Sequence, residues 1–304
     1  MIDLSVTVAG VRFANPVIAA SGTAAFGQEL DAIFGLEKLG GIALKAVTLE
    51  PRQGNPPPRV AETPSGMLNA VGLQNPGLEA FASTELPRLQ GKNTVRIANI
   101  AGTTLEDYTQ LAARMNHLPV DMVELNISCP NVKAGGVAFG VQPDMVLQIT
   151  QAVKNVLPNK PLIVKLTPNT ASISETAVAA QQGGADAVSL INTLTGMVID
   201  VHTRRPILAN TTGGLSGPAI RPVALRMVWE AARAVQIPII GMGGITTGED
   251  VIAFMLAGAC AVQVGTAILC DPYCVPRIVE EIEAYCVRHG VRHVADLIGA
   301  LETA

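Results

Sequence analysis

The residues best able to do chemistry in this chain stand at the ends of short apolar runs. Cys129 follows one such run in the segment "ELNISCPNVKAGGVAFG", residues 124–140. Lys45 and Lys165 interrupt two others, "IALKAVTL" and "LIVKLTP". A cysteine in this position is a packing residue, a metal ligand or a reactive thiol, and the segment alone leaves the three alternatives open.

Polar side chains recur at the ends of the other apolar runs. They are Ser21, Asn99, Asn126, Asn192 and Thr193. Burying such groups without partners costs about 1–3 kcal/mol each. One of them could be a satisfied core residue, but the repetition along the chain indicates a bound polar ligand.

Glycines follow the last two runs, in "GMGGI" and "VGTAI". In barrels of parallel strands, backbone N–H groups that glycine brings close after the last two strands commonly bind phosphate, although glycines also make plain tight turns. The lysines allow a Schiff base or a side chain that reaches out of the barrel mouth. Two lysines together with several asparagines fit an anionic ring system better.

Eight short apolar runs must position these residues. They are apolar nearly throughout, as expected for parallel strands covered on both faces, and span residues 15–21, 40–49, 95–102, 121–129, 160–168, 185–193, 237–245 and 260–269. Helical patterns between them cover residues 105–115, 143–156, 172–182, 219–235 and 247–257. This alternation predicts a (β/α)8 TIM barrel. A doubly wound sheet is the alternative, but no Gly-x-Gly-x-x-Gly follows the first run.

We expect a single domain over residues 1–304, with extended loops at about 50–76, 130–141 and 194–218. Long loops in a compact domain are usually functional. Two of these loops follow strand ends on the face where barrel enzymes build their sites.

The composition argues against nucleic acid, membranes and metals as partners. The formal net charge is -4 without a basic run, which argues against nucleic acid. No apolar run reaches the roughly 20 residues of a membrane-spanning helix, and the N-terminus does not resemble a secretion signal, so we expect no membrane association and a cytoplasmic protein. The five cysteines form no disulfide or metal-binding pattern, so no metal is expected.

Four segments together resemble the dihydroorotate dehydrogenase family. They are "LKAVTLEPRQGNPPPR", "GMLNAVGLQNPG", "NISCPNV" and "NTTGGLSGPAIRPVALRMV", and the resemblance extends over essentially the whole chain. It implies a barrel that binds one FMN at the C-terminal face of the strands and oxidises (S)-dihydroorotate to orotate in pyrimidine biosynthesis. It also implies that hydride passes from C6 to flavin N5.

The resemblance also implies two sets of binding residues. FMN is expected to contact Ser21, Lys45, Ala46, Asn99, Asn126, Lys165, Ile191, Gly217, Gly243, Gly244, Gly265 and Thr266, the last four around the phosphate. The substrate is expected to contact Lys45, Asn69, Ala70, Val71, Gly72, Leu73, Asn126, Asn131, Asn192 and Thr193.

Cys129 occupies the catalytic-base position of the family and would remove the C5 proton. The glycines that follow it, Gly135 and Gly136, suggest a loop that moves over the substrate. The membrane-bound class has serine at this position and an N-terminal extension. The chain resembles the soluble class 1 instead.

Within class 1, "ISCPNVKAGGVAFG" and "HTRRPILANTTGGLSGPAIRPVALRMV" resemble subclass 1B. In that subclass, a partner subunit with FAD and a [2Fe-2S] cluster passes electrons to NAD+. The implied assembly is a heterotetramer of two catalytic and two electron-transfer subunits. Alternatives are the fumarate-dependent subclass 1A, a dihydropyrimidine dehydrogenase-like flavoenzyme, a non-redox barrel that uses a lysine, and a non-enzymatic scaffold.

Overall fold

A closed barrel of parallel strands forms the centre of the protein. The computed structural model describes residues 2–127 and 140–302. Within these residues the barrel consists of β3 (Val17–Ala19), β4 (Gly41–Ala43), β7 (Val95–Ile100), β8 (Met122–Asn126), β9 (Leu162–Lys165), β10 (Ala187–Leu190), β15 (Ile239–Met242) and β16 (Ala261–Val264). The strand β16 pairs with β3 and closes the ring. The predicted TIM barrel is confirmed, with each strand shorter than the apolar run that predicted it.

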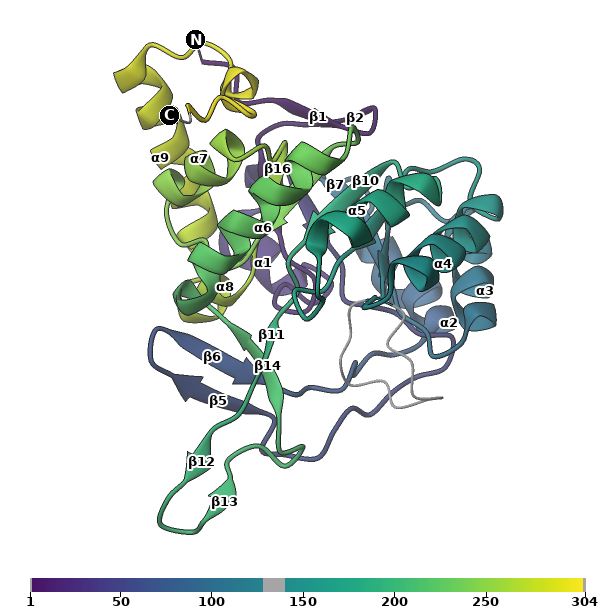
Figure 1. Cartoon of the computed structure of the whole chain (residues 1–304). Helices are drawn as coiled ribbons and strands as arrows, with labels where there is room; N and C mark the ends of the chain where they lie inside the picture. Colours follow the sequence, from purple (N-terminus) through teal and green to yellow (C-terminus); the bar gives the residue numbers. More distant parts are fainter. Residues whose placement is uncertain (1, 128–139, 303–304) are drawn as a thin grey trace.

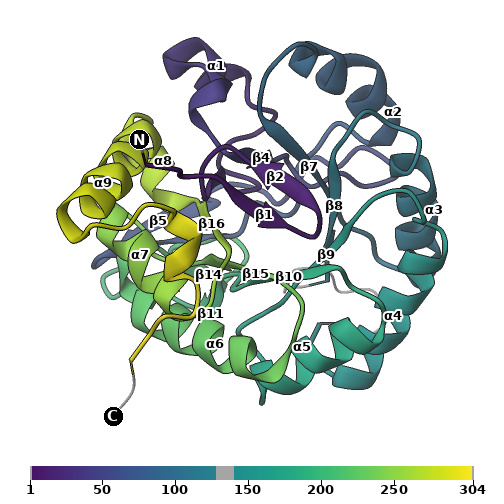
Figure 2. The ribbon, with the colours of Figure 1, turned by 90° about the horizontal axis from the view of Figure 1, so that it is seen from above.

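The strands are short because regular ladder pairing covers only the central part of each run. Apart from the first two residues of β7, every residue of the eight strands is buried. Helices surround the strands on the outside of the ring (Figure 2). This two-sided cover explains the continuous apolar runs, which a half-exposed strand would not tolerate.

The helices and helical turns connect the barrel strands along the chain. The α-helices are α1 (Gln28–Phe34), α2 (Leu78–Ala80), α3 (Leu105–Met115), α4 (Pro143–Asn155), α5 (Ile173–Gln182), α6 (Arg221–Ala234), α7 (Gly248–Leu256), α8 (Thr266–Cys270) and α9 (Cys274–His289). Shorter turns are η1 (Leu36–Lys38), η2 (Phe81–Glu85), η3 (Leu86–Leu89), η4 (Pro218–Ile220) and η5 (Val294–Leu297). None of the helices in the described parts of the chain combines the length and apolar character needed to cross a membrane.

Local sequence fixes where several helices begin. Thr104 and Asp107 form a reciprocal capping box at the start of α3, and Thr247 and Asp250 form another at the start of α7. Each box satisfies backbone N–H groups that have no partner in the first helical turn. The second box lies just after Gly243 and Gly244, so it fixes the turn that leaves strand β15.

The two ends of the barrel are covered differently. A hairpin of β1 (Val6–Val8) and β2 (Val11–Phe13) lies across the end where the strands begin (Figures 1 and 2). It buries Val6, Val8 and Phe13 in the core. The opposite end, where the strands finish, faces a separate small sheet (Figure 1).

This small sheet is built from two of the connections that the sequence indicated as extended loops. Its strand order is β11 (Leu194–Gly196), β14 (Gly213–Ser216), β6 (Gly66–Asn69) and β5 (Val60–Thr63). The central pair brings Asn69 opposite Gly214 in antiparallel register. A further hairpin of β12 (Ile199–Asp200) and β13 (Arg205–Pro206) extends from it (Figure 1). The third predicted loop, 130–141, lies almost wholly outside the described residues.

Candidate functional site

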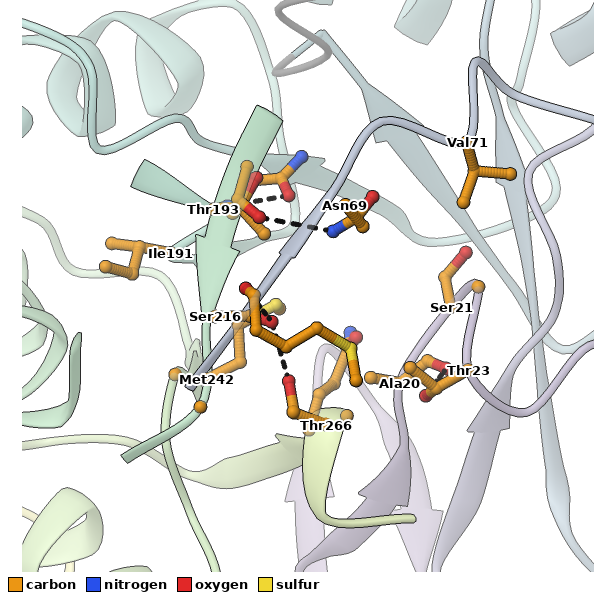
Figure 3. Close-up of a pocket in the computed structure, with 18 of the residues that line it drawn as sticks. Ala20, Ser21, Thr23, Asn69, Val71, Ile191, Thr193, Ser216, Met242 and Thr266 are labelled. Carbon is orange, nitrogen blue, oxygen red and sulfur yellow. Dashed lines mark hydrogen bonds between the residues drawn. The ribbon is translucent and has the colours of Figure 1, made fainter. Parts of the chain in front are cut away.

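A cavity lies between the C-terminal ends of the barrel strands and the small sheet. Figure 3 shows side chains from several elements around it, among them Ser21, Asn69, Ile191, Thr193 and Thr266. Ser21 follows β3, Asn69 ends β6, and Thr266 begins α8. The cavity therefore depends on the barrel and on the small sheet together.

Glycine turns form one side of the cavity. Gly217, Gly243 and Gly244 line it, with φ angles of 95°, 130° and 75°. A Cβ atom on Gly244 would lie 2.7 Å from the carbonyl oxygen of Gly217, so this backbone approach admits only glycine. Beside these turns, the Thr266 hydroxyl donates a hydrogen bond of 2.8 Å to the Ser216 hydroxyl (Figure 3). The result is a turn that exposes backbone groups and two hydroxyls to the cavity.

The charge of the cavity is positive. Among the described residues that line it, only Lys45 and Lys165 carry charged side chains. Lys165 is 6% exposed and ends strand β9, whereas Lys45 is half-buried and lies two residues beyond the end of β4. The prediction that Lys45 lies within the strand formed by run 40–49 is therefore wrong in detail: Leu44 and Val47 still bond to β7, but Lys45 lies in the interruption between them. Two cations without a lining carboxylate favour an anionic ligand.

Beneath Lys165, a group of polar side chains fills the barrel interior. Glu124 in β8 is fully buried, and its Oε2 accepts a hydrogen bond of 2.5 Å from Asn99 Nδ2. The ammonium of Lys165 lies 4.0 Å from the same oxygen. Asn99 Oδ1 in turn accepts a hydrogen bond of 3.3 Å from Asn126 Nδ2. A buried carboxylate is tolerated here because donors surround it.

Strand register explains why these residues meet. Asn99 is paired with Glu124 across β7 and β8, and Asn126 is paired with Lys165 across β8 and β9. Paired residues of neighbouring parallel strands present their side chains on the same face. The barrel therefore brings together polar residues that stand far apart in the sequence.

Two further donors reach Glu124 from β10 and β16. Ser189 Oγ and Gln263 Nε2 each donate a hydrogen bond of 2.7 Å to Glu124 Oε1. Gln263 is 1% exposed and lines the cavity, while its Oε1 has no hydrogen-bond partner within the described structure. A buried acceptor of this kind is suited to a donor on a bound ligand.

The segment that follows β6 forms the opposite wall. Asn75 holds this segment: its Nδ2 donates to the Leu73 carbonyl at 2.7 Å and to the Thr48 hydroxyl at 2.8 Å. Its Oδ1 accepts from the backbone N–H of Gly77 at 2.9 Å and of Thr48 at 3.2 Å. These bonds fix residues 71–73, which line the cavity.

A second asparagine fixes the chain beyond β10. Asn169 Nδ2 donates to the Thr193 carbonyl at 3.0 Å, and its Oδ1 accepts from the backbone N–H of Thr195 at 3.0 Å. Asn192 Oδ1 accepts from the backbone N–H of Thr193 at 2.8 Å. Asn192 and Thr193 both line the cavity, so their positions are set before a ligand arrives.

Comparison with known proteins gives this geometry a family. A family model described as "Dihydroorotate dehydrogenase" matches residues 3–286. The chain belongs to the dihydroorotate dehydrogenase family. It is 54% identical over 301 residues to a protein of Geobacter metallireducens, with 99% of this chain and 98% of the relative covered. It is 55% identical over 299 residues to a protein of Alkaliphilus oremlandii, with 98% and 99% covered.

Both relatives are named "Dihydroorotate dehydrogenase B (NAD(+)), catalytic subunit". Among solved structures, the chain resembles the dihydroorotate dehydrogenase of Eimeria tenella in complex with ferulenol. The TM-score is 0.83 at 24% identity, and the similarity covers 98% of this chain and 88% of that one. This last likeness supports the fold.

Most of the residues expected from the family resemblance lie around the one cavity. Those lining it are Ser21, Lys45, Ala46, Asn69, Val71, Gly72, Leu73, Asn126, Lys165, Ile191, Asn192, Thr193, Gly217, Gly243, Gly244, Gly265 and Thr266. Asn99 and Ala70 are buried and do not line it. Cys129 and Asn131 lie outside the described residues.

Sequence reasoning missed Glu124, Ser189 and Gln263. Glu124 carried the same signal as Lys165, a charge inside an apolar strand, and it stands two residues before Asn126 on the same face. Gln263 carried the weaker signal of one amide in "AVQV". The described residues contain no cluster of three or more His, Cys, Asp or Glu side chains able to hold a metal ion.

Proposed function

We propose that this chain is the catalytic subunit of an NAD+-dependent dihydroorotate dehydrogenase, which oxidises (S)-dihydroorotate to orotate in pyrimidine biosynthesis. The observation that carries the proposal is the cavity itself, whose charged lining residues within the described structure are two lysines. Dihydroorotate is a carboxylate, so its binding needs such cations. Relatives above 50% identity over nearly the whole chain bear this name.

The cavity also fits FMN. Gly217, Gly243 and Gly244 line it without side chains, so a phosphate would meet backbone groups there. Gly265 and Thr266 would complete this phosphate site, with Ser21, Ala46, Asn126 and Ile191 contacting the rest of the cofactor. When bound, FMN would supply the hydride acceptor. The ammonium of Lys165 would favour a cofactor that gains negative charge on reduction.

The substrate would lie between the cofactor and the segment after β6. Lys45, Asn69, Asn192 and Thr193 line this part of the cavity, together with residues 71–73. Hydrogen bonds from Asn75 and Asn169 hold the two walls in place. Prearranged walls of this kind reduce the entropy that substrate binding must overcome.

Cys129 is proposed as the base that removes the C5 proton of dihydroorotate. In the sequence it follows Asn126, the last residue of β8, by three residues. The thiolate is the basic form, and a free thiol titrates near 8.5. The reaction therefore needs surroundings that favour the thiolate, or its rate rises with pH.

A partner subunit is proposed to carry FAD and a [2Fe-2S] cluster, and to pass electrons to NAD+. The words "catalytic subunit" in the names of the relatives support a second subunit. We further propose a heterotetramer of two catalytic and two electron-transfer subunits, located in the cytoplasm.

The proposal is tested with the purified chain under anaerobic conditions. We expect flavin absorbance at about 450 nm that is bleached by dihydroorotate and restored by orotate. Cys129→Ala should keep the flavin and lose the bleaching, whereas Cys260→Ala, directly before β16 and away from the cavity, should retain both. A colourless chain that binds no FMN would refute the proposal.

The same preparation separates the alternatives. Bleaching by dihydrouracil in preference to dihydroorotate would indicate a dihydropyrimidine dehydrogenase-like enzyme. Rapid reoxidation by fumarate would indicate subclass 1A. Efficient NAD+ reduction by the isolated chain would show that no electron-transfer subunit is required.

A further inference from the structure

We propose that Glu124 is a positioning residue for the floor of the cavity, formed by the amides of Asn99, Asn126 and Gln263. Its carboxylate decides which atom each of these amides directs toward its neighbour, and it turns the carbonyl oxygen of Gln263 toward a donor on FMN. The inference rests on the proposed function, because it concerns the cofactor of that function. It goes further by assigning roles to two residues that the family resemblance did not indicate.

The carboxylate is placed to act on several side chains at once. Glu124 is fully buried, and its two oxygens accept hydrogen bonds from Asn99, Ser189 and Gln263 at 2.5–2.7 Å. A carboxylate offers only acceptors, whereas an amide can present either its NH2 group or its oxygen. Each neighbouring amide must therefore turn its NH2 group toward Glu124.

The orientation of Asn99 in turn fixes the orientation of Asn126. Because Asn99 directs Nδ2 at Glu124, its Oδ1 faces Asn126 and accepts a hydrogen bond of 3.3 Å from Asn126 Nδ2. Asn126 lines the cavity, whereas Asn99 and Glu124 do not. Two residues outside the cavity, Glu124 and Asn99, thus determine that Asn126 bonds to the barrel interior through Nδ2.

Gln263 provides the second observation. Its Nε2 is directed at Glu124, so Oε1 is the atom left for the cavity, and this buried oxygen has no partner in the described structure. An unpaired buried acceptor destabilises the protein until a donor arrives. The ring and ribityl chain of FMN carry N–H and O–H donors, so binding would satisfy Oε1.

Lys165 adds a charge effect to the same group. Its ammonium lies 4.0 Å from Glu124 Oε2 and faces the cavity. The carboxylate offsets part of this positive charge. Removing the carboxylate should therefore strengthen binding of the reduced, more negative cofactor relative to the oxidised one.

The test uses the full chain freed of flavin and titrated with oxidised and with reduced FMN. Glu124→Gln replaces one carboxylate oxygen with an NH2 group, which would then face another donor. Oε1 accepts two hydrogen bonds and Oε2 only one, so the NH2 group should take the Oε2 position, and Asn99 should turn its amide to accept from it. We expect the Kd for oxidised FMN to rise about tenfold, as for one lost hydrogen bond, and the Kd ratio of oxidised to reduced FMN to increase.

A second variant guards against misfolding of the first. Gln263→Met keeps the volume and removes the acceptor, so we expect a five- to tenfold rise in the Kd of oxidised FMN. Thr150→Val is the matched control, because Thr150 is buried with an unpartnered hydroxyl within the described residues and lies away from the cavity. Its Kd should equal that of the wild type.

The outcomes are separable. Wild-type chain that binds no FMN contradicts the proposed function. Wild-type chain that binds FMN, with Glu124→Gln and Gln263→Met within twofold of its Kd, overturns the role of Glu124 and Gln263. If Glu124→Gln does not fold, Gln263→Met decides, and an unchanged Kd in that variant refutes the assignment of Oε1.

Discussion

Asn75→Ala should impair dihydroorotate binding while leaving FMN bound. The side chain is 6% exposed and joins Thr48, Leu73 and Gly77 through five hydrogen-bonding contacts of 2.7–3.2 Å. Alanine removes all of them and leaves two backbone N–H groups without an acceptor. Each such group costs about 1–3 kcal/mol when it stays dry, although water that enters the space recovers part of this.

A net loss of about 3 kcal/mol follows, which is a large share of the 5–15 kcal/mol that usually stabilises a domain. The affected segment, residues 71–73, lines the cavity and lies outside the barrel ladder, so local release costs less than global unfolding. We therefore expect kcat/KM for dihydroorotate to fall about 100-fold, since 1.4 kcal/mol corresponds to a factor of 10.

The assay is anaerobic stopped-flow reduction of the flavin across dihydroorotate concentrations, with FMN content and urea unfolding measured on the same samples. Asn116→Ala is the control, because Asn116, directly after α3, accepts one hydrogen bond from the backbone N–H of Asn159 and lies away from the cavity. A kcat/KM within threefold of the wild type would show that Asn75 does not hold the substrate wall.

Three further predictions concern the cofactor turn, the helix cap and the base. Gly244→Ala places a Cβ 2.7 Å from the Gly217 carbonyl at a positive φ, so FMN affinity should fall far more than riboflavin affinity, and equal losses in a fluorescence titration would contradict a phosphate site. Burial favours a raised pKa for Asp250, but hydrogen bonds from Thr246 and the charge of Arg221 outweigh it and hold the pKa below its usual range. The stabilisation from the charged Asp250 is therefore complete above the unfolded-state pKa of about 3.9 and disappears as pH falls through the lower folded-state pKa. Asp250→Asn should lower the Tm at pH 7, and the difference in Tm from the wild type should disappear in acid. A difference in Tm that is independent of pH would refute the argument. Cys129→Ser should reduce flavin at a much lower rate near neutral pH, with recovery only in strong base, and an unchanged pH profile would remove the thiol from proton transfer.

The sequence was sufficient for the barrel because burial on both faces leaves a simple trace. Runs such as 160–168 and 237–245 are apolar nearly throughout, and the strands β9 and β15 lie inside them. The exact strand ends were less accessible, since the twist and tilt of a barrel decide where each ladder stops. Lys45 therefore follows β4, although its apolar surroundings placed it within a strand.

The small sheet was beyond reach for a different reason. Asn69 pairs with Gly214, and neither strand has the alternating apolar pattern that marks a strand from its own residues. Gly213 and Gly214 even weaken the local preference for a strand. Pairing across such a distance depends on the barrel that brings both segments to one end.

The hydrogen bonds around Glu124 could not be predicted from sequence motifs. Lys165 and Asn126 were recognisable from their place in apolar strands, but the bonds that orient them run through Glu124, which touches no ligand surface. Only the register of β7, β8 and β9 reveals this connection. Cys129 and Asn131 stay predictions from sequence.

The pairing of β6 with β14 has a consequence for redesign of the substrate pocket. One wall comes from residues 66–73 and the other from residues 192–216, and the two are joined by a shared ladder with Ser216 opposite Met67. A graft of either segment from a relative with another specificity would meet a mismatched neighbour. The two segments form one exchangeable unit, although more than a hundred residues of barrel separate them along the chain.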